Sequence, residues 1–270
     1  MNRVDAISRG LGEQPLESIA IPPMKDKVSE EEWAIRVDLA CAYRMVAHYG
    51  WDDLIFTHLS ARIPGAEHHF LLNPYNLMFE EVTASSLIKV DVEGNPVEPT
   101  PFITNPAGFT IHSAIHMARE DAHAVMHLHT EAGVAVSCMK GGLLPLNQTA
   151  LIICNDVAQH EYEGVALHLE ERERLTADLG GKNLMLLWNH GTLALGHTVP
   201  ECFMRLYYLE RACAIQVKAL TGGGLHLPSQ QSIDTTYQLG ATPGAVTYLA
   251  SLAWPALRRM LDREDRSYQN

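Results

Sequence analysis

The residues of this chain that are best suited to chemistry are its histidines, of which the 270 residues contain 14. His127 and His129 lie two positions apart in the apolar segment AHAVMHLHT, a predicted strand over residues 122–130. Successive side chains of a strand point to opposite faces, so both imidazoles point to the same face and can bind one ion. A random chain of this histidine content holds about 0.7 such pairs, so the spacing alone is also compatible with ordinary core histidines.

Placement favours a metal site. Both histidines lie at the end of an apolar strand that runs directly into a predicted helix at residues 131–139, where open α/β sheets present their sites. His190 has the same kind of position, after the apolar run 184–188 and before Gly191. Three neutral imidazoles with an open fourth position are typical of a catalytic divalent metal, most often zinc. The alternative is three separately satisfied core histidines.

Other histidines offer less specific signals. His112 and His116 lie one turn apart on a predicted helix over residues 107–118, and could add a metal ligand or a proton carrier. The alternative is that one is a half-buried packing residue and the other is exposed. His68 and His69 lie in a polar strand, and we expect both to face solvent.

Composition excludes several classes of protein. The 32 acidic residues exceed the 20 basic ones, giving a formal charge of −12, and no run of basic residues offers a surface for nucleic acid or an anionic membrane. Five cysteines without a CxxC pair, and an N-terminus without an apolar signal region, indicate a cytoplasmic protein. The glycine-rich motifs of the usual nucleotide-binding folds, GxGxxG and GxxxxGK[ST], do not occur, which excludes those folds. We therefore expect the partner to be a small-molecule substrate or another protein.

The elements that position these histidines can be read along the chain. Ser29 and Glu32 form a capping box that begins an amphipathic helix ending at Gly50. Short β-like runs in residues 54–91 alternate with turns at the spacing of an antiparallel meander. The pattern predicts a hairpin from strands at residues 183–191 and 192–196.

The last predicted elements follow this hairpin. Thr198 and Glu201 form a second capping box, for a long helix that ends at Leu220. We divide the chain into an arm at residues 1–28, a main domain at 29–225, and a tail at 226–270 with one short helix near residues 248–261. The predicted fold class is α/β, with a mixed or mostly antiparallel sheet covered by helices on both faces.

Four motifs together resemble the class II aldolase/adducin family. They are FTHLSAR (56–62), LLNPYNLMFEEVTASSLIKVD (71–91), His112 followed fifteen residues later by HLHT, and NHGTLALG (189–196) before a long helix. The resemblance covers roughly residues 30–225, and the stretch 71–91 is closest to the adducin-like branch. It implies a three-layer α/β/α fold with a central, mostly antiparallel sheet, zinc held by His127, His129 and His190, and a ring-shaped homotetramer with sites between subunits.

The chain departs from the family's sugar-phosphate aldolases around this metal site. Pro106-Ala107-Gly108 stands where the aldolases have Ser-Ser-Glu, whose glutamate is the acid/base. Their phosphate-holding Thr-Gly pair is replaced by Tyr75-Asn76, an asparagine by His58, and a tyrosine by a residue near Gln148-Thr149. The remaining candidates for the base are His112, His58 and Glu131, each of which also has an ordinary structural explanation.

The resulting prediction is a metal-dependent lyase that acts on a small hydroxy or keto acid through a metal-stabilised enolate. Decarboxylation and aldol cleavage by a relocated base both stay open, and manganese or iron could replace zinc. Two alternatives belong to other classes: a non-catalytic, adducin-like binding or assembly protein, and an iron-dependent oxygenase on the same scaffold.

Overall fold

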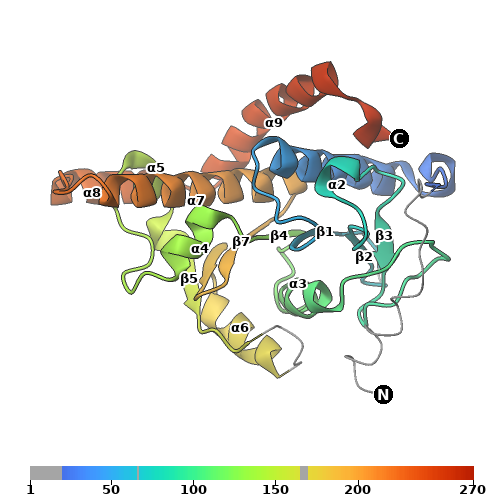
Figure 1. Cartoon of the computed structure of the whole chain (residues 1–270), viewed down its shortest axis with the longest axis horizontal. Helices are drawn as coiled ribbons and strands as arrows, with labels where there is room; N and C mark the ends of the chain where they lie inside the picture. Colours follow the sequence, from blue (N-terminus) through green and yellow to red (C-terminus); the bar gives the residue numbers. More distant parts are fainter. Residues whose placement is uncertain (1–19, 66, 165–169) are drawn as a thin grey trace.

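A computed structural model describes residues 20–65, 67–164 and 170–270, so most of the expected N-terminal arm lies outside the described residues. One seven-stranded sheet, ordered β3-β2-β1-β4-β7-β6-β5, forms the middle layer (Figure 1). Every neighbouring pair is antiparallel except β5 and β6, which are parallel. The predicted α/β class and the mostly antiparallel mixed sheet are confirmed. The strands are β1 (His58–Arg62), β2 (Phe70–Leu72), β3 (Ile88–Val90), β4 (Ala124–Leu128), β5 (Val157–His160), β6 (Leu184–Leu187) and β7 (Gly191–Gly196).

Helices cover both faces of this sheet (Figure 1). On one face, α2 (Glu30–His48) and α7 (Val199–Leu220) enclose the larger core with Leu59 of β1 and Met126 of β4. On the other face, α3 (Pro106–Ala118) and α6 (Glu171–Leu179) enclose a second core with Val125. Alternate residues of β4 therefore point into different cores, as the period of two requires. His127 belongs to the α3 face.

Shorter elements connect these layers. Two are short α-helices between β4 and β5, and four are single 3₁₀ turns. They are α4 (Glu131–Ser137), α5 (Gln148–Ile153), η1 (Lys25–Lys27), η2 (Phe79–Glu81), η3 (Cys154–Asp156) and η4 (Ser267–Gln269).

The local signals at the helix starts and turns are confirmed. The side chains of Ser29 and Thr198 accept hydrogen bonds from the backbone N–H groups of Glu32 and Glu201, so the N-cap half of each predicted capping box forms. The glutamate side chains pair with arginines instead. The meander is formed by β1, β2 and β3, and the hairpin by β6 and β7. His68 is exposed and His69 half-buried, but neither lies in a strand, since β2 begins at Phe70.

The C-terminal segment differs from the expected tail with one short helix. It forms two helices, α8 (Gln230–Gly240) and the 20-residue α9 (Ala245–Glu264). The expected helix at residues 248–261 is the central part of α9, with Pro255 inside both, whereas α8 was not expected. The buried Trp254 donates a hydrogen bond to Asp38 of α2 at 3.0 Å, which ties α9 to the main domain.

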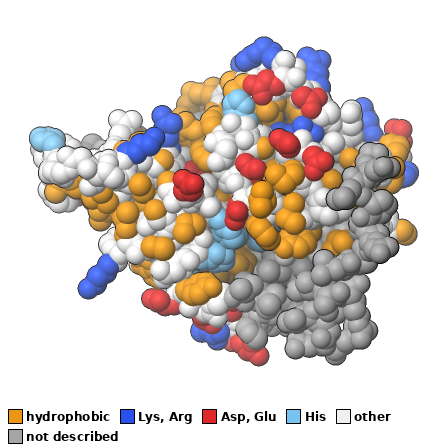
Figure 2. Space-filling model, in the orientation of Figure 1, with side chains coloured by type: hydrophobic (Ala, Val, Ile, Leu, Met, Phe, Trp, Pro, Cys, Tyr) orange, Lys and Arg blue, Asp and Glu red, His pale blue; other side chains and the backbone are white. Residues whose placement is uncertain are grey.

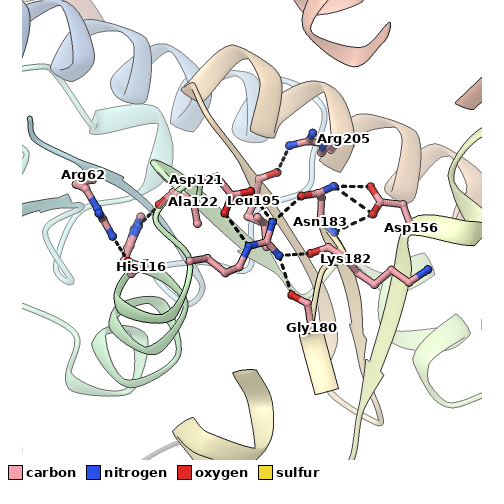
Figure 3. Close-up of polar contacts among 11 residues, drawn as sticks. Arg62, His116, Asp121, Ala122, Asp156, Gly180, Lys182, Asn183, Leu195 and Arg205 are labelled. Carbon is pink, nitrogen blue, oxygen red and sulfur yellow. Dashed lines mark hydrogen bonds and ion pairs between the residues drawn. The ribbon is translucent and has the colours of Figure 1, made fainter. Parts of the chain in front are cut away.

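Polar contacts connect the segments at the strand ends opposite the HxH motif (Figure 3). Arg119 donates to the carbonyl oxygens of Gly180 and Lys182, and Asn183 donates to Asp156. These partners satisfy one another, which indicates a structural role for this end. Among the described residues, no helix combines the length and apolar character needed to cross a membrane.

Candidate metal centre

The structure brings His127, His129 and His190 together, although 63 positions separate the first from the last. His127 is on β4, His129 follows that strand, and His190 is in the turn between β6 and β7. One ring nitrogen of each lies within 4.8 Å of the others, and the ring centroids are 4.7–4.8 Å apart. Figure 2 shows histidine side chains gathered near the centre of one face, with acidic side chains close by.

The hydrogen bonds of two rings leave their inner nitrogens ready to bind a metal. His127 Nδ1 lies 2.9 Å from the carbonyl oxygen of Thr192, and His129 Nδ1 lies 3.2 Å from Asp53 Oδ2. Both partners are acceptors, so in the neutral rings each Nδ1 carries the proton and each Nε2 presents a lone pair. The two Nε2 atoms are 2.9 Å apart. Two lone pairs at this distance repel unless a cation lies between them, and tetrahedral zinc holds nitrogens about 3.3 Å apart. The donor set therefore fits a divalent metal.

Electrostatics favours the neutral, ligand-competent form of these rings. Burial, followed by the neighbouring rings of His190 and His129, holds the pKa of His127 well below its usual range. Burial and His129 lower the pKa of His190 to about 4. Burial also lowers the pKa of His129, although the hydrogen bond to Asp53 acts in the opposite direction. At neutral pH no proton competes strongly with a metal ion for these nitrogens.

A series of hydrogen bonds on the α3 face determines which ring nitrogen of His112 carries the proton. Figure 3 shows the part of this series around His116. His116 Nδ1 donates to the carbonyl oxygen of Ala122 at 2.6 Å, so its Nε2 accepts from the Ser60 hydroxyl at 2.7 Å. Ser60 Oγ must then accept from His112 Nδ1, at 2.6 Å. The buried Nε2 of His112 is left with a lone pair and, within the described residues, no hydrogen-bond partner.

His58 connects this series of hydrogen bonds to the three histidines. It lies on β1 directly opposite His127 of β4, with the ring centroids 5.7 Å apart, and its ring is 4.3 Å from that of His112. His112 and His116 are each 1% exposed, so the expectation that one of them would be exposed is wrong. The sequence period of α3 did not reveal this, because the helix faces a polar part of β1.

The backbone beside His58 is strained. Thr57 has a φ of +65°, a left-handed conformation that a β-branched residue rarely adopts, and its side chain is buried. Such strain persists where the surroundings hold it, often at functional sites. Nothing in the sequence pattern singled out Thr57.

Glu131, the third candidate base, lies on α4 two positions after His129. It is exposed in the first turn of α4, on the wall of a cavity of about 710 Å³ that His129, Asp53 and Lys218 also line. Asp53 escaped the sequence analysis because it lies in a loop 76 positions from the histidine it contacts. The side chains of residues 106–109, including Pro106-Ala107-Gly108, lie outside the described part of the chain.

The buried His116 gives a testable pH dependence. Burial lowers the pKa of His116 from 6.5 to about 3, so the folded protein keeps this ring neutral while the unfolded chain protonates it. Its stabilising contribution is complete above pH 6.5 and is lost as the pH falls. We expect His116→Gln to be less stable than wild type at pH 7. The difference in free energy of unfolding between the two proteins should be smaller at pH 5, by up to ~2 kcal/mol.

Urea unfolding at both pH values, with a chelator present, measures this difference. His123→Gln, which changes an exposed histidine near the start of β4, is the matched control and should show no such decrease. A difference for His116→Gln that is the same at pH 7 and pH 5 would contradict the assignment of a buried neutral ring.

The sequence of this chain matches those of known proteins. Residues 37–217 match the family described as "Class II Aldolase and Adducin N-terminal domain". A Caulobacter vibrioides protein named "Putative aldolase class 2 protein" is 58% identical over 254 residues, covering 92% of this chain and 98% of that protein. Alpha-adducin of Mus musculus is 43% identical over 196 residues, covering 72% of this chain and 26% of the adducin.

Solved structures share the same fold. An aldolase II superfamily protein from Pseudomonas syringae superposes with a TM-score of 0.86 at 46% identity, covering 92% of this chain and all of that one (100%). L-fuculose 1-phosphate aldolase from Glaciozyma antarctica PI12 gives a TM-score of 0.79 at 28% identity, covering 92% and 97% of the two chains. The resemblance stated from the sequence motifs is confirmed: the chain belongs to the class II aldolase and adducin family.

Proposed function

We propose that this protein is a metal-dependent carbon–carbon lyase that acts on a small hydroxy or keto acid without a phosphate group. The observation that carries the proposal is the convergence of His127, His129 and His190, with the Nδ1 atoms of the first two held by acceptors. Zinc is the metal we propose, because three imidazoles are a common zinc ligand set; manganese or iron are the alternatives.

The roles follow from the positions of the side chains. A bound divalent metal would supply a Lewis acid that polarises a substrate oxygen and stabilises an enolate. His127, His129 and His190 would hold it. His58 lies beside the ligands with His112 behind it, so this pair is placed to hold a proton or to receive a substrate carboxylate. Glu131 is a third candidate base, at the cavity wall.

The substrate class follows from what the chain offers to an anion. A phosphate dianion needs several donors, and Pro106-Ala107-Gly108 provides neither hydroxyls nor a carboxylate in the sequence. Tyr75-Asn76 replaces the phosphate-holding pair, and both residues are half-buried. A carboxylate demands fewer donors, and decarboxylation can begin from the bound carboxylate without a separate base. This supports a hydroxy or keto acid.

A substrate screen tests the proposal. Protein analysed for metal is offered hydroxy acids, keto acids and phosphorylated sugars, and we expect cleavage or decarboxylation of a non-phosphorylated acid. His58→Ala should raise the KM for that acid by about tenfold, the value of one lost charge-assisted hydrogen bond, while the metal content is unchanged. Faster cleavage of a phosphorylated sugar than of any acid, or lyase activity that needs Gly108→Glu, would overturn the substrate assignment.

The second candidate is a non-catalytic, adducin-like assembly protein. The 43% identity to alpha-adducin favours it, although the match covers only 26% of that protein. The outer contacts of the histidines with Asp53 and the Thr192 carbonyl favour a metal site, as a purely structural domain needs neither. Absence of activity and of bound metal would favour the assembly role. Bound iron with oxygen consumption would favour the oxygenase alternative instead.

We also propose a cytoplasmic homotetramer. All five cysteines are free, which suits a reducing compartment. Exposed apolar side chains on α8 and α9, including Leu239, Tyr248 and Leu252, are available for contacts between copies of the chain.

A further inference from the structure

A buried carboxyl group lies behind the three histidines. Glu210, in the middle of α7, is 2% exposed, and both of its oxygens accept hydrogen bonds from hydroxyl groups. Thr130 donates to one oxygen and Thr192 to the other. No ion pair among the described residues includes Glu210.

Each threonine belongs to a segment that carries candidate ligands. Thr130 directly follows His129 and begins α4, where its hydroxyl accepts from the Gly133 N–H at 2.9 Å. Thr192 lies two residues after His190, and its carbonyl oxygen accepts from His127 Nδ1 at 2.9 Å. One carboxyl group therefore joins the end of β4 to the start of β7, the two segments that must stay in register for the three imidazoles to converge.

The packing around this carboxyl group is tight. A Cβ atom on Gly133 would lie 2.7 Å from Thr192 Cγ2, 2.8 Å from Thr130 Oγ1 and 3.3 Å from Glu210 Oε1. Only glycine leaves room for the threonines and the carboxyl group to meet. Small movements of either threonine are thereby restricted.

Stability alone does not explain a glutamate here. Burial raises the pKa of Glu210 to about 7, although both threonine hydroxyls oppose the shift. A buried carboxyl group without a cationic partner normally lowers the stability of a fold. An apolar side chain would cost less free energy at this position of α7. Another buried glutamate of the same helix, Glu201, has a clear structural partner, since Arg205 pairs with it at 2.7 Å.

We propose that Glu210 is a positioning residue of the metal centre: by holding the hydroxyls of Thr130 and Thr192, it fixes the orientation of His127 and the approach of His129. The inference rests on the proposed metal site. Residues that orient metal ligands without touching the ion typically contribute about 10–100-fold to metal affinity. Glu210 also borders the cavity that His129 lines, but the role proposed for it is exerted through the two threonines.

Zinc affinity, measured by competition with a chromophoric chelator, tests this role. Glu210→Gln keeps the size of the side chain, and Thr192→Val keeps its shape and its carbonyl oxygen while removing the hydroxyl. We expect each variant to bind zinc about 10–100-fold more weakly than wild type, and the double variant to be little worse than either one, because both changes break the same link.

Glu201→Gln is the matched control, since it removes a buried carboxylate from the same helix, at the end distant from the histidines. It should lower the urea midpoint while changing zinc affinity less than about twofold, whereas a general loss of stability would weaken zinc binding in all variants. If Glu210→Gln does not fold, Thr192→Val alone decides.

The outcomes separate this inference from the metal site itself. Zinc affinity equal to wild type in either folded variant, Glu210→Gln or Thr192→Val, would overturn the role of Glu210 and leave the three ligands in place. Wild-type protein that binds no zinc in this assay would overturn the metal centre, and the positioning role with it.

Discussion

Replacing His190 with alanine is expected to abolish tight binding of a divalent metal ion, and replacing His129 should do the same. Each change leaves two of three imidazoles, fewer than the three protein ligands of a catalytic zinc site. Elemental analysis of each variant, purified like the wild type without added metal, measures the loss. We expect the retained metal to fall at least about tenfold, because two imidazoles alone do not complete the ligand set of a zinc site.

A control for this experiment is His123→Ala. This exposed histidine precedes β4 but lies outside the group of three, so its loss should leave the metal content unchanged. Wild-type metal content in either His129→Ala or His190→Ala would remove that residue from the ligand set.

The largest expected effect on folding comes from Arg36→Ala. Arg36 is 1% exposed, pairs with Glu32 at 2.8 Å and donates to the carbonyl oxygens of Ala84 and Leu87 at 3.2 and 2.8 Å. Its removal leaves a cavity and two carbonyl oxygens without this donor. Among the described residues, Glu32 then keeps Lys89 as its single cationic partner, at 2.7 Å. We expect a loss of ~3–5 kcal/mol in the free energy of unfolding.

Urea denaturation monitored by circular dichroism measures this loss. Arg259→Ala, an exposed arginine on α9, provides the control and should change stability by less than ~0.5 kcal/mol. An Arg36→Ala protein within ~1 kcal/mol of wild type would mean that the contacts between α2 and the segment before β3 contribute little.

The three central histidines could be predicted from the sequence because their signals are local. A strand alternates its side chains, so His127 and His129 had to share a face, and the hairpin from β6 to β7 placed His190 at a strand end. The family motifs then supplied the connection between the two segments, which spacing alone could not.

Partners that depend on tertiary packing could not be predicted in this way. Asp53 and Glu210 contact the site from a loop and from a long helix, and no periodic pattern links either of them to the HxH motif. The burial of His116 depended on which part of β1 its helix covers. In the C-terminal segment, the predicted helix at residues 248–261 matches the central part of α9, whereas α8 was not predicted.

The position of β4 in the strand order affects how the chain folds while it is being synthesised. β4 pairs on one side with β1, which precedes it, and on the other with β7, which ends at Gly196. A nascent chain that has not reached β7 leaves one edge of the central strand, which carries His127, open to other strands. Truncated products of translation that stop before residue 191 should therefore be prone to aggregation, because this edge is covered only after residues 191–196 have left the ribosome.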